Sequence, residues 1–238
     1  MPEQILIVDD EAEIADLIEL YLKNENYAVH KFYTAREALA CAETEQLDLA
    51  ILDIMLPDMS GFDLCRRIRE KHTYPVIMLT AKDGEMDKIT GLTLGADDYI
   101  TKPFRPLEMV ARVKAQLRRY KKYNPAHGAE EAGEIMEHAG LVLNAKTHEC
   151  LLDEQPLALT PTEFSLLRIL LENKGNVVSA EELFHQIWKD EYYTKNNNTI
   201  TVHIRHLREK LRDSVEHPRF IKTIWGVGYK IETHPSKG

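Results

Sequence analysis

The segment Leu49–Gly61 reads LAILDIMLPDMSG, an apolar run that ends on one carboxylate, Asp53, with Pro57 four positions later. A short apolar run bounded by turn-forming residues is typical of a strand that is buried on both faces of a parallel sheet. An ionisable side chain at the end of such a strand has two explanations. It caps the next turn, or it belongs to a site at the edge of the sheet. The segments on either side distinguish the two.

Residues 1–120 alternate between apolar strand patterns and helical patterns with short connections. The predicted strands are 4–10, 27–32, 49–53, 75–80 and 98–101. The predicted helices are 11–27, 35–43, 61–72, about 85–94 and 106–119. Strands that alternate with helices in this way form a parallel sheet with helices on both faces. We therefore predict an α/β doubly wound domain with five parallel strands.

Polar side chains stand where these strands end. Asp9 and Asp10 follow the first strand, Asp53 ends the third, Thr80 ends the fourth and Lys102 follows the fifth. Open parallel sheets bind ligands outside the carboxyl ends of their strands, so we expect these groups to meet in one crevice. Three carboxylates repel one another unless a cation lies among them, and an oxygen-only set suits Mg²⁺. A lysine and a hydroxyl beside the cation are what a phosphoryl group requires.

Each of these residues has a plainer explanation when it is taken alone. Asp10 could cap the following helix, Thr80 could be structural and Lys102 could be a solvated loop residue. Their distribution over the strand ends, in the order that a phosphoryl site requires, favours the site.

Residues 121–136 are predicted to be a linker, because NPAHGAEEAGE (124–134) is rich in Pro, Gly, Ala and acidic residues. The 238-residue chain is long enough for a second domain, 137–238. It is predicted to contain short strands at 140–144, 148–153 and 155–160, helices at 161–175, 179–188 and 197–213, and a glycine-marked β segment at 220–232.

The helix predicted near the C-terminus combines an apolar stripe with a polar face. Its apolar stripe is Ile200, Ile204, Leu207 and Leu211, and its opposite face carries Asn198, Val202, Arg205, His206 and Glu209, flanked by Thr199. Although the whole chain has a net charge of −9, residues 195–230 hold eight basic and three acidic side chains. Such groups on one face can contact base edges and bind phosphates, so the helix is interpreted as a DNA-binding helix. The alternative interpretation is a basic surface helix that contacts only solvent.

The composition predicts a cytoplasmic protein. No segment has the order of a signal peptide, and no apolar run approaches the roughly 18 residues of a membrane span. The three cysteines are far apart and show no metal-ligand spacing. We expect free thiols in a reducing compartment and no membrane partner.

The segments VDDE, LDIMLPDMSG, LTA and DDYITKPF resemble the receiver domain of bacterial two-component response regulators. The second half, with LTPTEFSLLRIL, SAEELFHQIW and IKTIWGVGYKI, resembles the winged helix–turn–helix domain of the OmpR/PhoB family. The resemblance implies a flavodoxin-like receiver followed by a DNA-binding domain. In finer detail, stretches of both domains resemble regulators that activate vancomycin-resistance genes.

The resemblance assigns a role to each residue of the predicted crevice. It makes Asp53 the acceptor of a phosphoryl group from a sensor histidine kinase. It also implies that Mg²⁺ is bound by Asp10, Asp53 and the backbone carbonyl of Met55, with Asp9 assisting. The residues implied to bind the phosphoryl group or to respond to it are Thr80, Tyr99 and Lys102.

The resemblance also implies dimerisation on phosphorylation, through pairs between matching surfaces. The implied pairs are Lys88 with Glu108, Asp98 with Arg112, and Asp97 with Arg118 or Arg119. Composition alone is equally consistent with incidental surface pairs, each worth roughly 0 to 1 kcal/mol.

In the second domain the resemblance implies that Arg205 and His206 face DNA, that His203 and Arg208 lie close to phosphates, and that Thr223 of the wing contacts another. Residues 189–197 resemble the loop that touches RNA polymerase. Many relatives have an arginine where this chain has Trp225. Either the wing packs Trp225 against its own domain or against a DNA sugar, which we expect, or the wing contributes less preference for A·T base pairs.

We therefore predict a phosphorylation-activated transcriptional regulator, most simply an activator, and not an enzyme. A phosphoryl-transfer enzyme of the haloacid dehalogenase type is the first alternative, but it requires an acidic residue at position 55, which is Met. An adaptor with a degenerate receiver is the second. It predicts the loss of an acidic or lysine partner, and none is missing.

Overall fold

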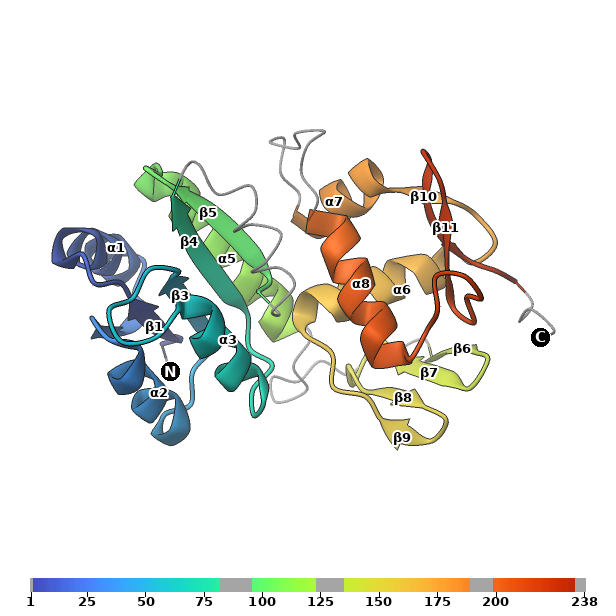
Figure 1. Cartoon of the computed structure of the whole chain (residues 1–238), viewed down its shortest axis with the longest axis horizontal. Coiled ribbons are helices and arrows are strands. Elements are labelled where there is room, and N and C mark those ends of the chain that lie inside the picture. Colours follow the sequence, from blue (N-terminus) through green and yellow to red (C-terminus); the bar gives the residue numbers. More distant parts are fainter. Residues whose placement is uncertain (1, 82–95, 123–134, 189–198, 234–238) are drawn as a thin grey trace. The chain divides into compact units, whose positions relative to one another are not determined.

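The computed structural model describes residues 2–81, 96–122, 135–188 and 199–233, apart from the side chains of residues 119, 121 and 122. The chain divides into two compact units, Met1–Tyr120 and Lys121–Gly238. Both units are drawn in Figure 1.

The first unit is a parallel sheet of five strands in the order β2-β1-β3-β4-β5. Its strands are β1 Gln4–Val8, β2 Ala28–Phe32, β3 Leu49–Asp53, β4 Val76–Ala81 and β5 Asp98–Lys102. Its described helices are α1 Ala12–Asn24, α2 Ala35–Thr44, α3 Gly61–Arg69 and α5 Pro106–Lys122. The predicted doubly wound sheet is confirmed. The helix expected near 85–94 lies outside the described residues.

Alternate residues of the central strands point to opposite faces of this sheet and bury two apolar layers. Ile5 and Ile7 of β1 pack in one layer with the apolar faces of α1 and α5. Leu6 and Val8 pack in the other layer with α2 and α3. Because both faces are covered, all five residues of β3 are buried, Asp53 included.

The described residues of the second unit form two small sheets and three helices. Its first sheet has the strands β6 Ile135–His138, β7 Leu141–Asn144, β8 Cys150–Leu152 and β9 Gln155–Pro156. Its helices are α6 Pro161–Glu172, α7 Ala180–Trp188 and α8 Thr199–Leu211. Its second sheet has the strands β10 Val178–Ser179, β11 Ile221–Ile224 and β12 Gly228–Ile231, in the order β10-β12-β11. The hairpin β11–β12 is the wing.

Strand β6 was not predicted, and it begins at Ile135, inside the segment expected to be a linker. Its sequence, IMEH, does not show a strand pattern. It forms because β7 supplies an antiparallel partner, with Ile135 opposite Asn144 and His138 opposite Leu141. At the other end of the linker, α5 continues to Lys122.

Helix α6 begins with a capping box that explains the sequence LTPTEF. The backbone N–H of Thr160 donates to Glu163 Oε2 at 2.7 Å, the Thr160 hydroxyl accepts from the N–H of Glu163, and Pro161 occupies the first turn. Lys210 of α8 donates to the same Glu163 oxygen at 2.6 Å. The buried Glu163 therefore fixes the start of α6 to the last turn of α8. Within the described residues, no helix has the length and apolar character needed to cross a membrane.

Candidate functional site

Three carboxylates meet at the carboxyl end of the parallel sheet. Parallel pairing sets Val8 of β1 opposite Leu52 of β3, so the residues that follow each strand are neighbours. Ligand oxygens of Asp9, Asp10 and Asp53 all lie within 4.8 Å of one another. Asp9 and Asp53 are buried and Asp10 is exposed, so the cluster has a closed floor and an open side.

Neither Asp53 nor Asp10 caps a helix, although Asp53 accepts a hydrogen bond from the backbone N–H of Ile54 in the turn that follows it. Ser60 caps α3, and its hydroxyl accepts a hydrogen bond from the N–H of Phe62. Helix α1 has Glu11 at its N-cap position and no side-chain cap. The two carboxylates are therefore placed at the edge of the sheet without a helix-capping role.

Lys102, at the end of β5, reaches into this cluster. Its Nζ lies 2.8 Å from Asp9 Oδ2, 3.4 Å from Asp53 Oδ1 and 3.1 Å from Glu11 Oε1. One cation thus faces the two buried carboxylates and a third, exposed one. Glu11 was not among the predicted residues, because nothing in its sequence context separates it from a surface residue of α1.

Burial dominates the electrostatics of the two inner carboxylates. Burial raises the pKa of Asp53 to about 6, with Lys102 opposing the shift and Asp9 adding to it. Burial likewise raises the pKa of Asp9, and Lys102 opposes it. Lys102 is the one cation that contacts this group of carboxylates among the described residues, so the cluster holds more negative charge than the lysine balances. An oxygen-only donor set with an open side and excess negative charge fits Mg²⁺.

The two predicted switch residues lie on adjacent strands. Thr80 of β4 is 1% exposed and stands in register with Thr101 of β5. Its hydroxyl donates to the carbonyl of Ala81 at 3.3 Å. Tyr99 of β5 has a buried hydroxyl with no hydrogen-bond partner among the described residues, and burial raises its pKa. The Tyr99 hydroxyl therefore has unused hydrogen-bonding capacity among the described residues, whereas the Thr80 hydroxyl gives its hydrogen to a neighbouring carbonyl.

Some of the residues predicted to pair between two copies of the chain already form ion pairs within one copy. Arg112 Nη1 lies 3.2 Å from Asp98 Oδ2 of its own chain, and Arg112 Nη2 lies 3.1 Å from Glu108 Oε1. Arg118 is exposed. Lys88 and the side chain of Arg119 lie outside the described residues.

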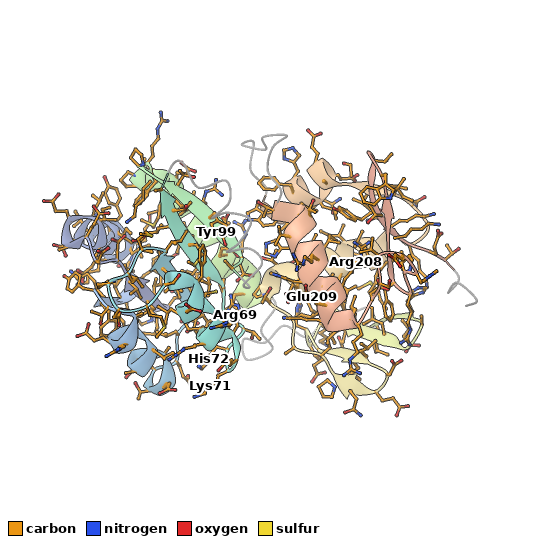
Figure 2. The ribbon with its side chains drawn as sticks, in the orientation of Figure 1. Arg69, Lys71, His72, Tyr99, Arg208 and Glu209 are labelled. Atoms are coloured by element: carbon orange, nitrogen blue, oxygen red, sulfur yellow. The ribbon has the colours of Figure 1, made fainter. Side chains whose placement is uncertain are left out.

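Asp97 is turned into the fold instead of toward the surface. It is 0% exposed, and its Oδ2 accepts from Arg69 Nη2 at 2.7 Å and from the N–H of Val76 at 2.9 Å. Arg69 also donates to the carbonyl of Tyr74 at 2.7 Å. Arg69, labelled near α3 in Figure 2, was not predicted, because it belongs to no motif. The surface role expected for Asp97 does not match its complete burial.

The exposed face of α8 is narrower than predicted. Arg205 and Glu209 are exposed and joined by an ion pair of 3.1 Å. Val202 and His206 were expected on this face, but each is 6% exposed. A helical wheel separates the two faces of an isolated helix and takes no account of cover from other elements. Thr199 is 7% exposed, and Asn198 lies outside the described residues.

His203 and Arg208, predicted near phosphates, are buried. His203 is 1% exposed, and its ring lies 5.9 Å from that of Trp188. Arg208 Nη2 donates to the carbonyl of Ile221 and to the hydroxyl of Thr223, both at 2.8 Å. His203 precedes Leu207 of the apolar stripe by four positions, and Arg208 follows Ile204 by four. Since residues four apart share a helix face, both side chains lie beside the stripe on the core side of α8.

Trp225 does not pack against its own domain, so of the two expected packing partners only a DNA sugar remains. Trp225 is 83% exposed at the turn between β11 and β12. The turn is closed by a hydrogen bond from the N–H of Val227 to the carbonyl of Ile224, and Gly226 has a φ of +74° with open space around it. The hairpin tip projects beyond the neighbouring strands, so nothing described in the chain covers the indole ring.

Comparisons with known proteins agree with this geometry. The family described as "Response regulator receiver domain" matches residues 5–114, and "Transcriptional regulatory protein, C terminal" matches residues 154–231. Regulatory protein VanR of Enterococcus faecium is 70% identical over 98% of this chain and 100% of its own. Regulatory protein VanRc of Enterococcus gallinarum is 53% identical over 98% and 100%.

Solved structures give the same result. A mutant of RitR has a TM-score of 0.73 at 28% identity, covering 97% of this chain and 99% of its own. The response regulator DrrB of Thermotoga maritima, described as an OmpR/PhoB homologue, has a TM-score of 0.51 at 33% identity, covering 98% and 100%.

Proposed function

Because this chain belongs to the OmpR/PhoB family of two-component response regulators, we propose that phosphorylation of Asp53 switches it between two states of promoter binding. The observation that carries this proposal is the meeting of Asp9, Asp10 and Asp53 with Lys102 at the end of the sheet.

In the proposed step, a carboxylate oxygen of Asp53 attacks the phosphorus of a phosphohistidine on a sensor histidine kinase. The new O–P bond forms as the P–N bond breaks, and the imidazole nitrogen keeps the bonding electron pair. The rigid, buried strand β3 holds the nucleophile in place, and Lys102 lies close enough to pair with the transferred oxygens. Bound Mg²⁺ would be held by Asp9, Asp10, Asp53 and the Met55 carbonyl, and it supplies neutralising charge for the phosphoryl oxygens.

The added charge is proposed to act through Thr80 and Tyr99. The Thr80 hydroxyl would redirect its hydrogen from the Ala81 carbonyl to the phosphoryl group, and the buried Tyr99 hydroxyl has no hydrogen-bond partner among the described residues. The response is a homodimer formed on the surface that includes Glu108 and Arg112, with Lys88, Asp98, Arg118 and Arg119 as further contacts. The close relation to VanR supports a VanS-like kinase and promoters of vancomycin-resistance genes. Residues 189–197, outside the described part of the chain, are proposed to touch RNA polymerase.

Light scattering coupled to size exclusion tests the switch. With Mg²⁺ and beryllofluoride, which mimics an aspartyl phosphate, we expect the mass to change from monomer to dimer. Binding to a VanR-type promoter should tighten in parallel, because two linked DNA-binding domains bind two half-sites together. Unchanged mass together with equal DNA binding in both states would refute the proposal.

On DNA, the proposed readout uses the start and the exposed face of α8 and the tip of the wing. The proposed contacts are Asn198 and Thr199 at the start of α8, Arg205 on its exposed face and Thr223 of the wing. The other members of the predicted set, Val202, His203, His206 and Arg208, have buried side chains. Arg205 is the exposed cation of this set, and Trp225 takes the remaining alternative, contact with a DNA sugar.

Arg205→Ala is expected to weaken binding of the activated chain to promoter DNA about tenfold, as the loss of one charged contact does. Its salt dependence should also become shallower, because fewer counterions are released.

Trp225→Ala should weaken binding without changing the salt dependence, since indole is uncharged. Fluorescence anisotropy with labelled duplex measures both effects, and Lys146→Ala, on an exposed residue of the first small sheet's connection, is the control. Wild-type affinity in Arg205→Ala would remove Arg205 from the interface.

A further inference from the structure

Arg208 joins α8, the helix proposed to read DNA, to the wing. It lies in the last turn of α8 and is labelled in Figure 2. Its Nη2 donates to the carbonyl of Ile221 and to the hydroxyl of Thr223, each at 2.8 Å, and both acceptors belong to β11. Arg208 is 8% exposed, so the bonds are largely shielded from water. A buried guanidinium with two short acceptors holds its position firmly.

A second bond ties the other end of the same helix to the same hairpin. The hydroxyl of Tyr229 on β12 bonds to the hydroxyl of Thr201 in the first turn of α8 at 3.2 Å. Tyr229 stands opposite Thr223 in the β11–β12 ladder. Thr201 and Arg208 are seven residues apart, about 10 Å along the helix. Two ties at this separation fix the angle of the wing as well as its distance from α8.

The bond between Arg208 and Thr223 also determines which way the threonine hydroxyl can act. A guanidinium has no acceptor, so the Thr223 oxygen must be the acceptor in this bond. The hydroxyl hydrogen is then free to be donated elsewhere. Thr223 is partly exposed, and a phosphate oxygen is an acceptor that such a donor fits.

We infer that Arg208 is a positioning residue and not itself a phosphate contact. It sets the wing at a fixed spacing from α8 and orients the Thr223 hydroxyl as a donor. The two bonds occupy both hydrogens of Nη2, and the 8% exposure of Arg208 leaves little of the rest of its guanidinium accessible to a phosphate. This inference rests on the proposed function for its DNA part, whereas the coupling of helix and wing is a property of the free protein.

Amide hydrogen exchange on the full chain without DNA tests the coupling. In Arg208→Gln, amides of residues 221–231 are expected to exchange about tenfold faster, while those of α6 keep their protection. Arg205→Gln is the matched control and should leave the wing unchanged. Equal exchange of the wing in wild type and Arg208→Gln would overturn the inference. Faster exchange in α6 as well would mean that Arg208→Gln destabilises the whole domain. The exchange of the wing is then compared between wild type and Arg208→Lys, which keeps the charge but not the planar group.

Salt titrations with promoter DNA test the role in binding. A residue that neutralises one phosphate contributes about 0.9 to the slope of log affinity against log salt. Arg208→Gln should therefore bind about tenfold more weakly with an unchanged slope, and the losses in Arg208→Gln and Thr223→Val should not add in the double variant. A slope reduced by about 0.9, with additive losses, would make Arg208 a phosphate contact. If wild type itself fails to prefer promoter over scrambled DNA, the proposed function fails, and the exchange experiment still decides the coupling.

Discussion

Asp53→Asn is expected to abolish phosphorylation and every response that follows from it. An amide has the same size and keeps an acceptor oxygen, but it is not a nucleophile toward phosphorus at neutral pH. The variant also removes one of two buried carboxylates whose charges burial disfavours, so the fold should remain intact. In gels that retard phosphorylated protein, no band should appear after incubation with Mg²⁺ and acetyl phosphate, and the mass should stay monomeric.

Asp63→Asn is the control for this experiment. It makes the same chemical change in the same unit, on an exposed side chain of α3 that pairs with Arg66. It should be phosphorylated like the wild type. If Asp53→Asn were phosphorylated to the wild-type extent, the phosphoacceptor would lie elsewhere and the proposed function would have to be revised.

Gly61→Ala is expected to destabilise the first unit strongly, although it adds only one methyl group. A Cβ on Gly61 would lie 1.9 Å from the carbonyl oxygen of Asp53 and 2.8 Å from its carbonyl carbon. Both are backbone atoms of a buried strand, so neither can move aside as a side chain can. The N–H of Gly61 donates to the carbonyl of Ile54 at 2.9 Å, which holds the loop against the strand.

The clash must displace either the loop or the end of β3, and we expect a loss of about 3 kcal/mol in unfolding free energy. This loss corresponds to a fall of about 10 °C in the melting transition of the first unit, measured by calorimetry on the full chain. Gly226→Ala is the control, because it adds a Cβ with no atom within 4 Å and costs only the strain of its positive φ. A transition of Gly61→Ala within about 2 °C of wild type would contradict the steric argument.

The sheet and the carboxylate cluster were predictable because they follow from rules that need only chain order. Apolar runs alternating with helical patterns predict parallel strands, and parallel strands bring their carboxyl ends to one edge. Asp9, Asp10, Asp53 and Lys102 therefore met where they were expected to meet. The helices of the second unit were predictable from their apolar periodicity, and the sequence of the capping box marks the start of α6.

Residues whose roles depend on non-local partners were not predictable. Asp97 looks like a surface acid until Arg69, 28 positions earlier, is found beside it. Arg208 looks like a phosphate ligand until β11 is found within its reach. Trp225 was expected to pack against its domain or a DNA sugar because it cannot make the charged contact of an arginine, and its 83% exposure rules out the domain. In each case the sequence pattern gives the position of the residue on its own helix or strand, but it does not show which other helix or strand packs against that residue.

Arg112 already has two acceptors, Asp98 and Glu108, within its own chain. A dimer that pairs Arg112 with Asp98 of a second copy must first open an equivalent bond in each copy. Assembly is then an exchange of partners, with as many ion pairs before as after. Such an exchange contributes specificity for a matching surface but little net free energy. In the proposed dimer, the affinity would therefore come from changes that phosphorylation makes elsewhere on that surface.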